Sequence, residues 1–555
     1  MYRNRLGCQA NAHRLKQFKP WEKIMKLLPT SRAVILSMSL AAASTVWSHE
    51  DGKSPEQLGV VSFPTSCAPG VQARFTRAVA LLHSFWFSEG EKAFREVLSL
   101  DPDCAIANWG IAAILINNTF AGGATPESAR KAQEAIDRGR ATGAKTERER
   151  MYLEAVAQYW QDFAGRPHGA RMKTLSDAFE QLAKRYADDD EAQIFSAIYL
   201  TATQAPTDLT FAATLKAAAI LEPLMVKHPE HPGVAHYLIH SYDYPPIAAK
   251  GLAAARRYSE IAASAPHALH MPSHIFTRVG AWQDSVTANR RSANTAKDDK
   301  TPGDWLHALD YMAYANLQLA RDAEVVSNIN EGKSVPDLNP AVMPIGYSLA
   351  AMPARYAVER GMWKEAAALE PRNSRFTFAD AMVWFAKALG SARSGDLAGA
   401  EQSAKWLGDT ADELALAKNA YWATEVRVQH QAALAWIAYA KGNRDAALAQ
   451  MRSAADLEDT SGKHAVSPGR LIPARELLAE MLMQSGNPAE ALAQYERSQV
   501  NDPNRLRSLY GAGLAAAQSN NRDKAKMYYS RVAQLVGTSD ARPEFKQMRE
   551  YMASN

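Results

Sequence analysis

The feature that most constrains the fold of this 555-residue chain is a recurrence of similar residues at intervals of 34 positions. Near the C-terminus, Ala491 and Tyr495 recur as Ala525 and Tyr529. A fixed period of this length indicates a repeat architecture, in which each unit buries its apolar face only against its neighbours. The small alanine fits where two helices cross, and the aromatic ring fills the groove beside them. The recurrence therefore predicts an array of stacked helical hairpins.

The same unit has the turn glycine and the closing proline of a tetratricopeptide repeat (TPR), a helical hairpin of this period. Gly486 lies at the expected turn between two helices, and Pro503 closes the unit. Pro232 and Pro266, also 34 residues apart, extend the period into the middle of the chain. Segments rich in Ala and Leu favour helix throughout. We therefore predict an all-α fold, a right-handed superhelical solenoid of TPR-like helical hairpins with a concave inner groove.

The strength of the repeat varies along the chain and divides it into five segments. The prediction is a signal peptide and leader over 1–48, an N-terminal coil over 49–70, degenerate N-terminal helical hairpins over 71–231, His-bearing TPR-like hairpins over 232–330, and a C-terminal TPR array over 331–555.

Several histidine- and aromatic-rich strings resemble those of a group of bacterial exported TPR-repeat proteins. The resemblance covers most of residues 60–535 and implies a helical-repeat fold and export. It implies no particular activity and supplies no catalytic residues. The strings are Leu81–Phe87, Asp101–Cys104, Asn108–Gly110, Ala235–Asp243 and Pro266–Phe276.

The N-terminus has the layout of a secretory signal peptide. An apolar run over 33–43 follows Lys26 and Arg32, and Val46 and Ser48 fit the −3 and −1 positions of a cleavage site. The run is too short to span a bilayer. We expect a periplasmic or secreted protein with no membrane span after signal cleavage, although an uncleaved anchor is the alternative.

Removal of this leader changes the charge of the protein. Residues 1–48 hold eight Lys or Arg and one Glu, a net +7, so the +4 of the whole chain becomes about −3. No general basic surface remains, and we expect no nucleic-acid partner. The start of translation, Met1 or Met25, stays open.

Two of the three cysteines lie outside the leader, Cys67 and Cys104. In an oxidising compartment, such a pair indicates one disulfide, and closing that loop is worth roughly 3–4 kcal/mol. Two free buried thiols are the alternative.

Histidines form an ordered set in the middle of the chain. His236 and His240 are four residues apart, and His270 and His274 repeat the arrangement 34 positions later. On a helix, residues four apart share one face, so both pairs occupy equivalent positions in successive repeats.

Paired histidines at this spacing are a bidentate metal arrangement, and imidazole suits zinc or copper. The next unit adds His307 and Asp310 as further candidate ligands. We therefore consider a transition-metal site, with zinc or copper, in which the four paired imidazoles converge on one inner pocket. A polar pocket for an anionic or polar ligand and plain packing are the alternatives.

Other side chains offer weaker signals. His83 is compatible with the groove or with packing, and His267 is either a ligand or a helix-start residue. The loop around His464 is expected to cover one end of the groove. Arg355 and Arg475 each follow a Pro-Ala pair, which fits either an anion-binding lining or salt bridges between repeats.

Two classes of function follow from these features. The first is an exported TPR scaffold that binds a peptide, a protein or a small polar ligand in its groove. The second is a transition-metal-binding protein or metalloenzyme that uses the paired histidines. The chain contains neither Gly-x-Ser-x-Gly nor a complete His-Glu-x-x-His, so whether it is an enzyme stays open.

Overall fold

The computed structural model describes residues 56–120, 123–339, 342–462, 464–539 and 542–554. The predicted signal peptide and leader lies outside these residues. From Glu56 onward the chain forms one compact unit. All regular elements in the described part are helices, and no strand occurs there, which confirms the predicted all-α solenoid of TPR-like hairpins.

The N-terminal helices begin where a polar side chain caps a free backbone amide. At the starts of α4, α5 and α7, the side chains of Thr125, Thr146 and Asp189 each accept a hydrogen bond from the backbone amide three residues later. The helices are η1 (Pro69–Val71), α1 (Gln72–His83), α2 (Phe87–Leu100), α3 (Ala105–Ile114), α4 (Pro126–Thr142), α5 (Glu147–Trp160), α6 (His168–Arg185), α7 (Asp190–Thr201) and α8 (Ala212–Lys227).

In the middle of the chain, several helices begin with proline. Proline has no backbone N–H, and an N–H at the first helical position would have no partner within the helix. Pro232, Pro266 and Pro302 open α9, α11 and α14 in this way. The elements are α9 (Pro232–Tyr242), η2 (Ala248–Gly251), α10 (Leu252–Ile261), α11 (Pro266–His270), α12 (Pro272–Val279), α13 (Trp282–Asp298), α14 (Pro302–Gln318) and α15 (Asp322–Lys333).

The C-terminal array shows the predicted repeat most clearly. Ala491 and Ala525 are fully buried, and the Tyr495 and Tyr529 rings fill the space above Gly511 and Gly513 of α24. The elements are α16 (Met343–Glu359), α17 (Trp363–Ala367), α18 (Thr377–Ser394), α19 (Leu397–Leu416), α20 (Ala420–Ala440), α21 (Arg444–Glu458), α22 (Ala474–Gln484), α23 (Pro488–Asn501), α24 (Leu506–Gln518), α25 (Arg522–Val536) and α26 (Pro543–Ser554).

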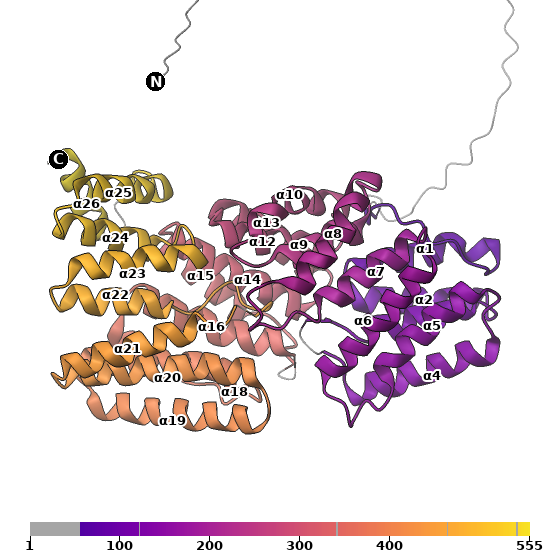
Figure 1. The fold of residues 1–555 in the computed structure, drawn as a ribbon, viewed down its shortest axis with the longest axis horizontal. Helices are drawn as coiled ribbons and strands as arrows, with labels where there is room; N and C mark the ends of the chain where they lie inside the picture. Colours follow the sequence, from indigo (N-terminus) through magenta and orange to yellow (C-terminus); the bar gives the residue numbers. More distant parts are fainter. Residues whose placement is uncertain (1–55, 121–122, 340–341, 463, 540–541, 555) are drawn as a thin grey trace, which may run out of the picture. The chain divides into compact units, whose positions relative to one another are not determined.

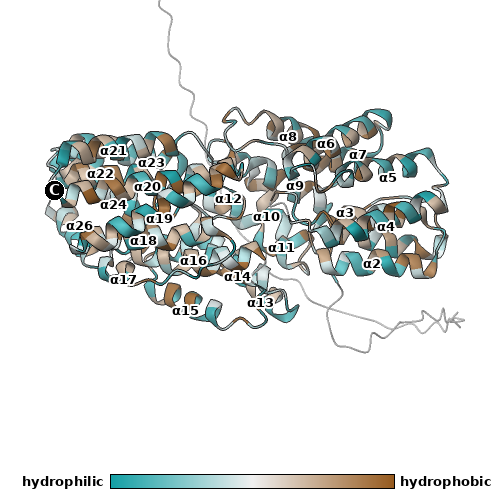
Figure 2. Ribbon diagram, turned by 90° about the horizontal axis from the view of Figure 1, so that it is seen from below, coloured by the Kyte–Doolittle hydropathy of each residue, from teal (hydrophilic) through white to brown (hydrophobic). Residues whose placement is uncertain are grey.

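Helices consecutive in sequence pack against one another, as in α13 with α14 and α19 with α20. Brown and teal residues both occur on most helices in Figure 2, as expected for helices with one buried face. Contacts also join helices far apart in sequence, since α1 packs on α9 and α24 on α14. The helices α9, α12 and α14 lie together in the middle of the described part (Figure 1).

Two large apolar cores occupy the two halves of this unit. One draws its residues from Leu58 to Ala288, and the other from Ala320 to Met548. Smaller clusters, built around α14, lie between them. The helices α9, α11 and α12, which carry the paired histidines, contribute to the first core, and α14 contributes to the smaller clusters.

A disulfide joins Cys67 to Cys104, the pair predicted from the sequence, with 4.8 Å between their Cα atoms. It ties the coil before α1 to the start of α3. The nearby Ala68 amide donates to the Asp101 carboxylate at 2.7 Å, which fixes the same junction. Among the described helices, none has both the length and the apolar character that a bilayer span requires.

Pro272 divides the second histidine-bearing segment into two short helices, α11 and α12. The segment begins at Pro266, six residues before this proline. Proline lacks the amide that would continue the helical ladder, and the interruption falls at Met271. His267 and His270 consequently lie on α11, whereas His274 lies on α12.

Candidate metal centre

Six histidines from α9, α11, α12 and α14 lie close together, and we refer to them as the histidine cluster. Neighbouring rings in the cluster have centroids 4.4–6.4 Å apart. The members are His236, His240, His267, His270, His274 and His307.

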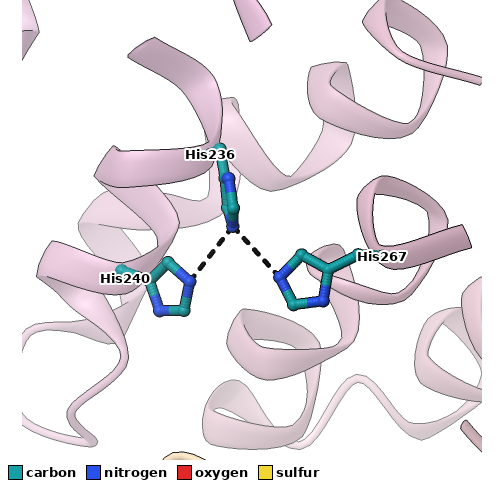
Figure 3. A group of neighbouring side chains, drawn as sticks. All are labelled: His236, His240 and His267. Atoms are coloured by element: carbon teal, nitrogen blue, oxygen red, sulfur yellow. Dashed lines mark hydrogen bonds between the residues drawn. The ribbon is translucent and has the colours of Figure 1, made fainter. Parts of the chain in front are cut away.

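The first triad consists of His236, His240 and His267. The Nε2 atom of His236 lies 3.1 Å from Nε2 of His240 and 3.2 Å from Nε2 of His267. Figure 3 shows the His236 ring pointing between the other two. Three side chains from α9 and α11 thus direct a ring nitrogen toward one point.

The second triad consists of His270, His274 and His307. The Nε2 atoms of His270 and His274 are 3.0 Å apart. The His307 ring approaches from α14, with its centroid 4.4 Å from that of His270. Its Nδ1 atom is buried and has no hydrogen-bond partner among the described residues. In each triad the three candidate ligand atoms lie within 4.8 Å of one another.

Hydrogen bonds on the far side of the rings determine which nitrogen carries the proton. His236 Nδ1 donates to the backbone carbonyl of His83 at 2.6 Å, because a carbonyl can only accept. Asn289 donates its own amide to Ser285 O at 2.7 Å, so its Oδ1 accepts from His270 Nδ1 at 2.6 Å. Neutral His236 and His270 therefore keep a lone pair on Nε2.

His274 is oriented by a carboxylate. Its Nδ1 donates to Asp243 Oδ2 at 2.8 Å, and Arg278 Nε donates to Asp243 Oδ1 at 3.0 Å. Burial opposes ionisation of Asp243, but His274 and Arg278 outweigh it and lower the pKa of the carboxyl group. A carboxylate on the outer nitrogen is the arrangement that orients histidine ligands of metals.

In the second triad, two lone pairs consequently face each other across 3.0 Å when both rings are neutral. Such a pair repels unless a proton or a metal ion lies between the nitrogens. In a tetrahedral site with zinc–nitrogen bonds of about 2.0–2.1 Å, neighbouring nitrogens are roughly 3.3 Å apart. The observed separations of 3.0–3.2 Å in both triads are close to this value.

The surroundings keep these rings neutral. Burial first, and then the neighbouring histidines, lower the pKa of His236, His240, His267 and His270 well below its usual value. Burial together with His274 lowers the pKa of His307 to about 3. Neutral imidazole is the form that binds metal, so burial makes the nitrogen lone pairs available near neutral pH.

Aromatic side chains enclose the cluster. Phe120 stacks on His240 with 4.1 Å between centroids, and Tyr311 stacks on His274 at 5.1 Å. Phe85 packs against His236 at 4.5 Å and against His267 at 5.3 Å. Phe85 also has a φ of 53°, a left-handed conformation that is costly for a bulky residue and is found most often at functional sites.

The structure divides the candidate ligands differently from the sequence prediction. His236 and His240 belong to one triad and His270 and His274 to the other, so the four paired rings do not form a single four-histidine set. His307 joins the second triad as a candidate ligand. His267, which the sequence left between ligand and helix-start residue, completes the first triad.

Asp310 does not join the cluster, in contrast to its candidacy as a ligand. It forms a fully buried ion pair with Arg355, which lies one repeat further along the chain. Asp310 lies one turn beyond His307 on α14, but the buried guanidinium of Arg355 on α16 is its charge partner, so its carboxylate is not directed at the histidines. Arg475 likewise pairs with Asp456 and Asp459, so both arginines act in salt bridges and not as an anion-binding lining.

His83 belongs to a separate hydrogen-bonded network. Its ring contacts Glu191 and the Tyr237 hydroxyl, each at 2.9 Å, and Glu191 also accepts from His231 at 2.9 Å. Burial opposes the charge on Glu191, but the two histidines lower its pKa to about 2. The Val234 amide donates to the other nitrogen of His231, so this network is satisfied by hydrogen bonds and orients the His83 carbonyl.

The loop between α21 and α22 contacts α14 and the connection between α7 and α8. The Gly462 amide donates to Pro206 O at 3.1 Å, and the Tyr311 hydroxyl donates to Ser467 O at 3.1 Å. His464 does not point toward the cluster. Its ring packs instead beside Tyr421 and Trp422.

Comparison with known proteins assigns no function to the chain. No family model and no curated protein matches the chain. A structure of the human IFIT1 dimer with PPP-AAAA is 12% identical, with 78% of this chain and 90% of that chain covered and a TM-score of 0.39. The TPR domain of P58(IPK) is 10% identical, with 87% and 99% covered and a TM-score of 0.21. Similarities this weak say nothing about what this chain binds.

The fold and the site together define a class: a TPR-like solenoid with a cluster of imidazoles enclosed by its helices. Within that class, this chain is distinguished by two histidine triads whose ring nitrogens converge pairwise at 3.0–3.2 Å.

Proposed function

We propose that this protein binds transition-metal ions through the two histidine triads of the cluster. The observation that carries the proposal is the His270–His274 pair. Outer hydrogen bonds to Asn289 and Asp243 fix the protons on Nδ1, and the two Nε2 atoms face each other at 3.0 Å. A bound cation turns this repulsive contact into two metal–ligand bonds.

The ligand set favours zinc or copper. All six donors are imidazoles, which suit zinc, copper, iron and nickel, and the cluster contains no thiolate. Three protein ligands per ion leave one coordination position for water or a substrate, as in catalytic zinc sites. An ion held in this way would supply an activated water molecule or a polarised substrate oxygen.

The solenoid serves in this proposal as the exported scaffold that builds the site. Signal-peptide features, the Cys67–Cys104 disulfide and the resemblance to exported TPR-repeat proteins support a periplasmic or secreted location. The α21–α22 loop hydrogen-bonds to Tyr311, which also packs on His274. A peptide, protein or small polar ligand bound beside this loop would therefore be compatible with a metal site.

The test is elemental analysis of protein purified without a histidine tag. We expect a near-stoichiometric transition metal that is lost when His240→Ala and His274→Ala are combined. The matched control is His228→Ala, because His228 is a partly exposed histidine that pairs with Asp190 outside the cluster. Absence of bound metal, together with an unchanged melting temperature after addition of zinc or copper, would contradict the proposal.

A further inference from the structure

The two triads are immediate neighbours. The ring centroid of His240 lies 6.0 Å from that of His274, and His267 lies 6.1 Å from His270. Each of these pairs joins a member of the first triad to a member of the second. Ions bound in both triads would therefore lie within one buried space and would feel each other's charge.

The protein supplies little negative charge to that space. Every candidate ligand is an imidazole, and Asp243 is the one carboxylate that hydrogen-bonds to a ring of the cluster among the described residues. Its charge is already shared with Arg278, which is 4% exposed. The donors of the two triads therefore cannot neutralise ions of high charge.

We infer that the cluster is a dinuclear copper site, with one copper(I) ion in each triad. The inference rests on the proposed metal-binding function and names the ion, its charge and its stoichiometry. Two triads of three convergent nitrogens provide two complete ligand sets, and His307, with its unpartnered buried Nδ1, belongs to the second.

The charge of the ion decides between copper and zinc. Repulsion between two ions scales with the product of their charges, so two monovalent ions repel four times less than two divalent ions at the same separation. Burial intensifies this difference because the surroundings screen charge poorly. Copper(I) fills both triads at the lowest electrostatic cost, and zinc(II) fills one much more readily than two.

Two single substitutions separate the triads with little disturbance to the fold. His267 and His307 are partly exposed, and neither makes an outer hydrogen bond of the kind that fixes His236 or His270. His267→Gln removes a donor from the first triad, and His307→Gln removes one from the second. Circular dichroism and the melting temperature of the metal-free variants confirm that each still folds.

The experiment titrates the full-length mature protein with copper(I) under anaerobic conditions, and separately with zinc(II), and counts bound ions by native mass spectrometry. We expect two copper(I) ions in the unaltered protein, one in each single variant and none in the double variant. For zinc, we expect the second ion to bind at least tenfold more weakly than the first, whereas the two copper affinities differ by less. The control His228→Gln should retain two copper ions.

The outcomes distinguish this inference from the proposed function. One copper ion in the unaltered protein, or two zinc ions bound as tightly as two copper ions, would overturn the dinuclear copper assignment and leave metal binding standing. No binding of either metal would overturn both.

Discussion

Acidification of the metal-free protein should destabilise it sharply, because five cluster histidines are held neutral in the fold. Their pKa values are lowered, in His307 to about 3, whereas histidine side chains in the unfolded chain titrate near their ordinary pKa of about 6.5. Below that value the unfolded state binds more protons than the folded state. Stability is therefore fully present above pH 6.5 and is lost as the pH falls.

The size of the loss follows from the number of groups. Between pH 7.5 and 5.5, a histidine that stays neutral in the fold costs about 1.4 kcal/mol, so the cluster as a whole costs several kcal/mol. Burial also lowers the pKa of His464, to about 4, which adds to the loss. Glu458 works in the opposite direction, because burial raises its pKa to about 8 and the fold retains its proton, which offsets part of the loss.

Urea unfolding of chelator-treated protein at pH 7.5, 6.5 and 5.5 measures this effect, and most of the loss should fall in the lower half of the range. In His307→Gln the loss should be smaller by about 1.4 kcal/mol, the share of one histidine. His228→Gln, which removes an imidazole outside the cluster, is the control. A free energy of unfolding that stays constant or rises between pH 7.5 and 5.5 would refute the reasoning.

Three further predictions concern the contacts around the site. Asn289→Ala removes the acceptor that orients His270 and should weaken metal binding by roughly 10–100-fold in a competition titration; an unchanged affinity would contradict the role of the outer hydrogen bond. Asp310→Ala leaves its buried guanidinium partner unpaired and should cost about 3–5 kcal/mol in urea unfolding without changing the number of bound ions. Replacing Cys67 and Cys104 by serine should cost about 3–4 kcal/mol, and equal stability of the variant would show that the bond constrains little.

The repeat architecture could be predicted from the sequence because the residues that recur every 34 positions are those that pack one unit against the next. Tyr495 and Tyr529 occupy the space above glycines of α24, and larger residues at those glycines would collide with the rings. Each unit must fit its neighbour in this way. The residues that recur are therefore the residues that pack.

The histidine pairs could also be predicted, but their grouping could not. Their four-residue spacing placed His236 beside His240 and His270 beside His274. Which rings share a point depends on the break at Met271 and on the approach of α11 to α9. His267 joins the first triad through that approach, and a period in the sequence carries no information about it.

Asp310 shows a second limit of the same kind. Its position near His307 suggested a ligand, but its side chain pairs with Arg355 of the following repeat. A carboxylate in a helical array has partners on several neighbouring helices, and the sequence does not say which one it faces. The left-handed conformation of Phe85 was equally hidden, because it arises from the tight connection between α1 and α2.

X-ray absorption at the metal edge tests the central claim most directly. Tag-free protein loaded with copper or zinc should show a first shell of nitrogen atoms at about 2.0 Å, with the outer-shell scattering of imidazole rings. A shell of oxygen or sulfur donors, or a metal that is lost on simple buffer exchange, would show that the two triads do not hold the ion.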